Sequence, residues 1–308
     1  MAQIELAGRL PRPIAYVLAG GASFGSVQLG HIRALAQTDL TPDLVVGTSV
    51  GSLNGAVVAE DPAAAPERLT ELWSTVTRQE IFGTLVKHAV NLAAGRPAAV
   101  SNEGLRAFIE RAITARDFAD LQLPLTAMAT DFTTGRAVSL DSDDLVSALL
   151  ASAAIPLVFP SVERKGRTLV DGGLVANVPI KVAAGLGAQT LVVLDCGFTV
   201  MPPEREDTAT GRLLRTAAIM AAQQVRRDLE LVTDRTVLYL PGPWPIRTRP
   251  DDFRTAAEIA TRTFGLTMSW LHALDPQGPG RYGSAPTDAL AKAQPLPRPE
   301  AADRFPEH

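Results

Sequence analysis

Short apolar runs recur along this chain, and longer stretches with apolar residues every three or four positions separate them. Most of the runs show no alternation with polar residues, which is typical of strands covered on both faces. The pattern predicts strands at Ile14–Leu18, Leu44–Val46, Leu125–Ala129, Ala137–Leu140, Leu191–Leu194 and Thr236–Tyr239.

The periodic stretches predict amphipathic helices between these strands. Residues 101–113 (SNEGLRAFIERAI) begin with the capping start Ser101, Asn102 and Glu103, and their apolar side chains fall on one face. Residues 210–225 and 256–271 show a similar pattern, and residues 131–138 (DFTTGRAV) indicate a tight hairpin. Strands that alternate with helices predict an α/β fold with a largely parallel sheet.

Composition narrows the class of protein. The 308 residues are 46% hydrophobic and 20% charged, as in ordinary globular proteins, and the net charge of −4 argues against a nucleic-acid partner. The single cysteine, Cys196, excludes an internal disulfide, and a metal site built on several Cys or His residues is not expected. Residues 278–308 are rich in Pro, Ala and charge, so we expect one domain over residues 1–277 followed by a mobile tail.

The apolar run near the N-terminus, IAYVLAG, is preceded by Arg9 and Arg12 and weakly resembles a signal peptide. Pro11 and Pro13 interrupt the approach, however, and no small-residue cleavage site follows. No apolar run approaches the roughly 18 residues that a membrane-spanning helix needs. We therefore expect a soluble, cytoplasmic protein.

Ser49 lies in a G-x-S-x-G motif at the junction of a strand and a helix. Residues 45–55 (VVGTSVGSLNG) place Gly47 and Gly51 on either side of the serine. Such glycines permit a sharp turn that exposes a nucleophilic serine, and the following helix directs its N-terminal N–H groups toward it. A turn of small residues that only packs a helix on the sheet is the alternative.

A glycine loop follows the first predicted strand and could present backbone amides to an anion. The spacing in Leu18–Gly30 (LAGGASFGSVQLG) is not G-x-G-x-x-G, and Ser26 stands where a phosphate-binding loop needs lysine. Nucleotide binding is therefore disfavoured. An oxyanion hole for an acyl carbonyl and a tight strand–helix turn remain; the candidate residues are Gly20, Gly21, Ala22, Ser23, Phe24 and Gly25.

Asp171 is the candidate base for Ser49. It follows an apolar strand and precedes Gly172 and Gly173, although Asp-Gly is also common turn chemistry. Of the 4 histidines, only His272 has the serine–aspartate–histidine order of an α/β-hydrolase. That fold needs several strands before its nucleophile, and only one clear strand precedes Ser49.

Four motifs occur in the order and spacing of patatin-like phospholipases: GGASFG, GTSVG, ASAAIP (Ala151–Pro156) and DGG. The chain resembles that family over about residues 14–274. The resemblance implies a three-layer α/β/α fold, a Ser49–Asp171 dyad without a catalytic histidine, and an oxyanion hole formed by the Gly20–Gly25 amides. It also implies hydrolysis of acyl esters in lipids without a metal. No cofactor is expected, and contact with a membrane surface is expected only transiently, if the substrate lies in a bilayer.

Phe24 departs from the family pattern, which has Arg or Lys just before the last glycine of the loop. Its presence could change the rate or the headgroup preference, or Phe24 could line an acyl pocket. Three hypotheses therefore remain: a Ser–Asp acyl hydrolase, a protein of the same fold that binds acyl chains or a partner without turnover, and a triad hydrolase that uses His272. The oligomeric state is left open.

Overall fold

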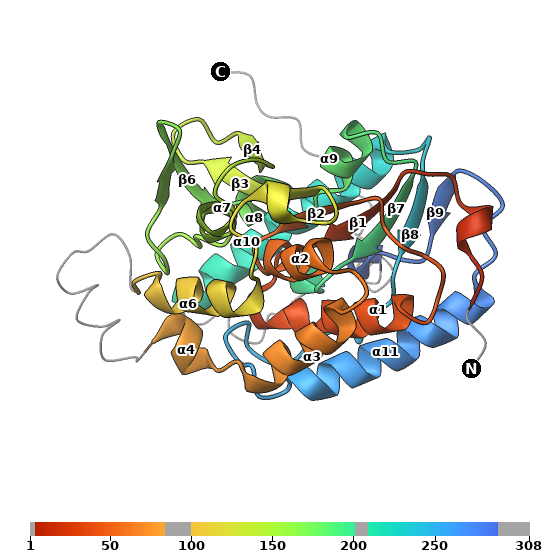
Figure 1. Ribbon diagram of the computed structural model, residues 1–308, viewed down its shortest axis with the longest axis horizontal. Coiled ribbons are helices and arrows are strands. Elements are labelled where there is room, and N and C mark those ends of the chain that lie inside the picture. The colour runs from red at the N-terminus through yellow and green to blue at the C-terminus, as the bar shows by residue number, and fades with distance from the viewer. Residues whose placement is uncertain (1–3, 84–99, 201–208, 289–308) are drawn as a thin grey trace, which may run out of the picture.

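The computed structural model describes residues 4–83, 100–200 and 209–288, which form a mixed sheet between two layers of helices (Figure 1). In the described residues the strand order is β5-β6-β3-β2-β1-β7-β8-β9, and β4 pairs with β3 beside this path. The strands are β1 (Ile14–Leu18), β2 (Leu44–Thr48), β3 (Leu125–Asp131), β4 (Ala137–Leu140), β5 (Val162–Arg164), β6 (Arg167–Asp171), β7 (Thr190–Leu194), β8 (Thr236–Tyr239) and β9 (Gly280–Tyr282).

Strands β3, β2, β1, β7, β8 and β9 are neighbours in this order and run parallel to one another. Strands β4 and β6 are antiparallel to β3, and β5 is antiparallel to β6. Strand β1 lies in the middle and is buried at all five positions. Its side chains alternate between two separate apolar clusters: Tyr16 and Leu18 belong to one, and Ala15 and Val17 to the other. The continuous apolar run therefore reflects burial on both faces.

Helices cover both faces of the sheet. The cluster of Tyr16 contains residues from α1 (Ser26–Leu35), α2 (Val50–Glu60), α3 (Ala65–Thr75), α4 (Arg78–Phe82), α6 (Glu103–Ala112), α7 (Leu145–Ser152) and α11 (Ala256–Ala273). The cluster of Val17 contains residues from α8 (Gly173–Ala176), α9 (Ile180–Gly185) and α10 (Ala209–Leu231). Helices α1, α3 and α11 lie together below the sheet in Figure 1. The three-layer α/β/α arrangement is confirmed.

All six predicted strands are present, and β2 and β3 extend two residues further than predicted. The hairpin prediction is also confirmed, since β3 and β4 pair across a turn in which Gly135 has a φ of 67°. The capping prediction for α6 is wrong in detail. The Asn102 side chain makes no capping hydrogen bond, and Ser101 Oγ instead donates to the Glu103 carboxylate.

The predicted start of the tail is too early. Residues 280–282 form β9, which pairs with β8 in parallel, and the Thr236 hydroxyl donates to Gly278 O. Backbone hydrogen bonds to the buried strand β8 hold residues 280–282 in place, although the predicted tail is rich in Pro, Ala and charge. The remainder of the predicted tail, residues 289–308, lies outside the described residues. Within the described ranges, no helix combines the length and apolarity that a bilayer-spanning segment requires.

Gly51 controls how closely α2 approaches β1, because a Cβ at this position would lie 2.4 Å from Leu18 O and 2.5 Å from Ala19 O. We expect Gly51→Ala to lower the free energy of unfolding by about 1–3 kcal/mol, since the helix must shift. The matched control is Gly265→Ala in α11, where nothing lies within 4 Å and the substitution should add about 0.5–1 kcal/mol through helix propensity. Urea titration measures both, and equal effects would contradict the packing argument.

Candidate active site

Ser49 occupies a strained turn between β2 and α2. Its φ of 54° and ψ of −126° lie in a region that non-glycine residues rarely adopt. The turn is held from both sides: Thr48 Oγ1 donates to Ala176 O at 2.6 Å, and Ser49 O accepts from Ser52 N at 2.8 Å. Observed backbone strain at a buried hydroxyl is typical of functional serines.

The four motif glycines are required by close packing around this turn. A Cβ at Gly47, Gly51 or Gly172 would lie within 2.5 Å of a backbone oxygen. At Gly173, it would lie 3.0 Å from Asp171 Oδ1. Larger residues at the first three positions would therefore displace α2 from β1 and β2, or the turn after β6 from β3.

Asp171 is the last residue of β6 and lies level with Ser49 across β3. In the sheet register, Asp171 pairs with Ala129, while Thr48 pairs with Met128 on the other side of β3. The Ser49 hydroxyl donates to Asp171 Oδ2 at 2.6 Å, and Gly173 N donates to Asp171 Oδ1 at 2.7 Å. The sheet thus joins two residues that are far apart in the sequence.

Burial raises the pKa of the Asp171 carboxyl to about 6, against the opposing effect of the hydrogen bonds from Ser49 and Gly173. No arginine or lysine is among its hydrogen-bond or ion-pair partners in the described part of the chain. A carboxylate in this setting is a stronger base than an ordinary aspartate and still ionises near neutral pH.

The glycine loop, which comprises residues 20–25, lies beside Ser49. A Cβ at Gly20 would lie 3.3 Å from the Ser49 Cβ. Three of the loop amides already have acceptors: Gly20 N donates to Asn177 O, Ser23 N to Pro250 O and Phe24 N to Gly21 O.

Two consecutive amides of the glycine loop, those of Gly21 and Ala22, have no hydrogen-bond partner among the described residues. Ala22 has a φ of 50°, again rare for a residue with a side chain, and it lines the same pocket as Ser49. Gly21 is pressed against Cys196, since a Cβ there would lie 2.6 Å from the cysteine Cβ. Two unpaired N–H groups beside a buried hydroxyl could stabilise a negatively charged oxygen.

Phe24 does not line a pocket beside Ser49. Its side chain is fully buried and belongs to the apolar cluster of Val17 and Tyr239, beneath the glycine loop. The prediction that Phe24 could line an acyl pocket is therefore wrong. The buried Phe24 ring contributes to the apolar cluster on this face of the sheet.

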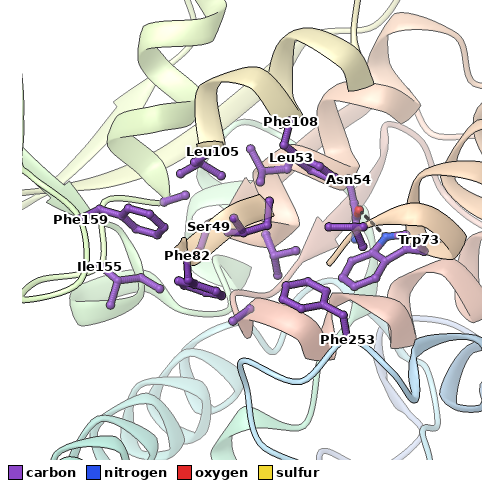
Figure 2. Close-up of a pocket in the computed structure, with 15 residues that line it drawn as sticks. Ser49, Leu53, Asn54, Trp73, Phe82, Leu105, Phe108, Ile155, Phe159 and Phe253 are labelled. Atoms are coloured by element: carbon purple, nitrogen blue, oxygen red, sulfur yellow. Dashed lines mark hydrogen bonds between the residues drawn. The ribbon is translucent and has the colours of Figure 1, made fainter. Parts of the chain in front are cut away.

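An apolar pocket opens beside Ser49 (Figure 2). The cavity has a volume of about 50 Å³ and lies in a hollow that measures about 520 Å³ when the adjoining open solvent space is included. Apart from Ser49 and Asn54 its lining is apolar, and Trp73 Nε1 donates to Asn54 Oδ1 at 3.1 Å. Five aromatic side chains contribute to the walls: Trp73, Phe82, Phe108, Phe159 and Phe253. Such a lining suits a hydrocarbon chain.

Neither described histidine contacts the Ser49 hydroxyl. His272 is exposed near the end of α11, and its Nδ1 bonds to Met268 O of the same helix at 2.7 Å. His31 is buried in α1, and its Nε2 bonds to Pro241 O at 3.0 Å. The geometry therefore does not support the triad through His272. His88 and His308 lie outside the described residues.

Two residues that support the site were not indicated as such by the sequence. Ser152 Oγ accepts from Ser49 N at 3.0 Å and donates to Met128 O at 2.6 Å, so it fixes the turn. Asn177 O accepts from Gly20 N at 2.9 Å and thereby ties the glycine loop to the segment after Asp171. For Ser152 the available signal was a polar residue inside a run of small and apolar ones, whereas Asn177 acts through its backbone carbonyl and gives no such signal. In the described ranges, no group of three or more His, Cys, Asp or Glu side chains could hold a metal ion.

Comparison with known proteins gives a family and several relatives. Residues 16–184, more than half of the chain, match the family model described as patatin-like phospholipase. The chain is 31% identical over 191 residues to patatin-like phospholipase domain-containing protein 7 of Rattus norvegicus, across 60% of this chain and 14% of that protein. It is 29% identical over 204 residues to lysophospholipase NTE1 of Mycosarcoma maydis, across 64% of this chain and 10% of that protein.

A bacterial relative is similar along most of its length. An NTE family protein of Mycobacterium bovis is 27% identical over 291 residues, which cover 92% of this chain and 78% of that protein. By contrast, the aligned part is about a seventh of the rat relative. The match to the family model contains the glycine loop, Ser49 and Asp171. On this match, the chain belongs to the patatin-like phospholipase family.

Proposed function

We propose that this protein is a serine acyl hydrolase that cleaves acyl esters of lipids, with Ser49 as the nucleophile and Asp171 as the base. The observation that carries the proposal is the 2.6 Å hydrogen bond from the Ser49 hydroxyl to a buried carboxylate, at the edge of an apolar pocket. Ionised Asp171 takes the Ser49 proton as Oγ attacks the ester carbonyl carbon.

The charge that develops on the carbonyl oxygen needs hydrogen-bond donors, and the N–H groups of Gly21 and Ala22, which have no partner among the described residues, are the candidates in the glycine loop. When the tetrahedral intermediate collapses, the alkoxide leaving group takes the proton from Asp171, and the acyl group remains on Ser49. A water molecule then gives its proton to Asp171 and attacks the acyl-enzyme, which releases the fatty acid and returns the proton to Ser49 Oγ.

The apolar pocket supports a lipid acyl chain as the part of the substrate that the protein recognises. Two relatives have names that contain phospholipase or lysophospholipase, which agrees with a lipid ester as substrate. Transient contact with a membrane surface and a cytoplasmic location remain predictions. Non-catalytic acyl-chain binding is the alternative outcome of the tests below.

Removal of either proposed catalytic group should abolish activity. We expect Ser49→Ala to lower kcat/KM for p-nitrophenyl esters at least about 10³-fold, and Asp171→Asn about 10²–10⁴-fold, because the nucleophile or its base is lost. Fluorophosphonate labelling, mapped by mass spectrometry, should modify Ser49 in the wild type alone. His272→Ala is the control and should keep full activity. Full activity in a folded Ser49→Ala protein would contradict the proposal.

The rate should depend on the ionisation of Asp171. Since the base must be deprotonated and its pKa is about 6, kcat/KM should rise about tenfold per pH unit below pH 6 and level off above it. A pH–rate profile with an uncharged ester measures this directly. A rise centred near pH 4 would show that Asp171 behaves as an ordinary carboxylate.

The raised pKa of Asp171 also predicts how the free energy of unfolding depends on pH. The folded protein keeps the Asp171 proton up to about pH 6, whereas the unfolded chain loses it near pH 4, so stability falls as the pH rises between these values. Asp171→Asn, which resembles the protonated form, should match the wild type at pH 4 and exceed it by up to about 3 kcal/mol at pH 8. Denaturant unfolding at the two pH values tests this, and equal stability at pH 8 would contradict the raised pKa.

A further inference from the structure

The segment of residues 249–253 connects the glycine loop with the apolar pocket. It belongs to the connection between β8 and α11 and lies beyond the residues that match the family model. At one end, Ser23 N donates to Pro250 O at 2.9 Å and Ser23 Oγ donates to Arg249 O at 3.2 Å. Ser23 directly follows Ala22, so this end of the segment is anchored to the glycine loop.

At the other end, Phe253 forms part of the pocket wall. Its ring stacks on Trp73 with centroids 6.0 Å apart and meets Phe82 at 6.4 Å (Figure 2). Phe82 in turn stacks on Phe159 at 5.6 Å. The rings come from four separate segments of the chain, so the wall depends on what holds these segments together.

Asp251 lies between the two ends and is held by charge. Arg78 Nε donates to Asp251 Oδ2 at 2.9 Å, and Arg249 Nε donates to Asp251 Oδ1 at 2.7 Å. Burial raises the pKa of the Asp251 carboxyl, but the hydrogen bonds from Arg78 and Arg249 outweigh burial and leave the pKa below its ordinary value. The Asp251 carboxyl is therefore ionised at neutral pH.

Arg78 links this carboxylate to the neighbouring part of the pocket wall, which Phe82 forms. It is the first residue of α4, and its guanidinium carbon lies 6.0 Å from the centre of the Phe82 ring at the other end of that helix. One ion pair thus fixes α4, with Phe82, against the segment that carries Phe253. A partly buried, hydrogen-bonded pair is stronger than an exposed one.

We infer that Asp251 is a positioning residue for acyl-chain selectivity: paired with Arg78, it holds Phe253 against the wall of the pocket that receives the chain. The inference rests on the proposed function. Because the bonds from Ser23 anchor the segment independently of Asp251, loss of the carboxylate should loosen the wall and leave the glycine loop in place. Long acyl chains should then lose binding, while an acetyl group, which has no chain to place, should not.

The test compares p-nitrophenyl decanoate with p-nitrophenyl acetate. In Asp251→Asn we expect the ratio of kcat/KM for decanoate to that for acetate to fall about tenfold or more, mainly through KM, with acetate hydrolysis kept within about threefold. Arg78→Gln should also lower the ratio, and the double variant should add little to Asp251→Asn, since that substitution already removes the ion pair with Arg78. Arg78→Lys, which keeps the charge, should restore part of the selectivity.

Asp252→Asn is the matched control. Asp252 is the neighbouring residue, but its carboxylate pairs with Arg254, whose side chain is 88% exposed, so the ratio should not change. Melting temperatures establish that each variant is folded. An unchanged ratio in folded Asp251→Asn would overturn this inference alone, provided that the wild type shows hydrolysis that depends on Ser49. If the wild type hydrolyses neither ester, the proposed function fails as well.

Discussion

The hydrogen bond between Ser49 and Asp171 joins the ends of two strands that β3 separates, and the arrangement of the sheet follows from it. Strand β6 runs antiparallel to β3 and pairs only with its last three residues, so β6 ends at Asp171, opposite Ala129, while the parallel strand β2 ends at Thr48, opposite Met128. This register brings the Asp171 carboxylate level with the serine, although 122 positions separate the two residues in the sequence.

Several features around this bond are unfavourable for folding and are compensated by their surroundings. Asp171 is buried without a cation, and Ser49 and Ala22 have positive φ values. The compensation is local: Gly173 N bonds to the carboxylate, Ser152 Oγ bonds to Ser49 N, and Thr48 ties the turn to Ala176. Burial of apolar side chains in two clusters on opposite faces of the sheet offsets the free-energy cost of these features.

The central part of the fold can be predicted from the sequence because strands buried on both faces appear as uninterrupted apolar runs. Strands β5 and β9 lack that signal: each has three residues with at least one exposed charged side chain, and only pairing with a neighbour makes it a strand. The same distinction applies to the site. Ser49 and Asp171 are indicated by glycine spacing, whereas Asn177 and Pro250 act through backbone carbonyls, which any residue possesses. Asp251 pairs with an arginine 173 positions away, which no local pattern reveals.

The backbone conformation of Ser49 affects which substitutions evolution favours at this position. Its φ of 54° and ψ of −126° suit glycine better than any residue with a Cβ, so selection for folding alone would favour glycine there. A copy of this gene released from its function would drift toward that replacement. A serine retained at this position in descendants of the chain is therefore itself a record of continued use.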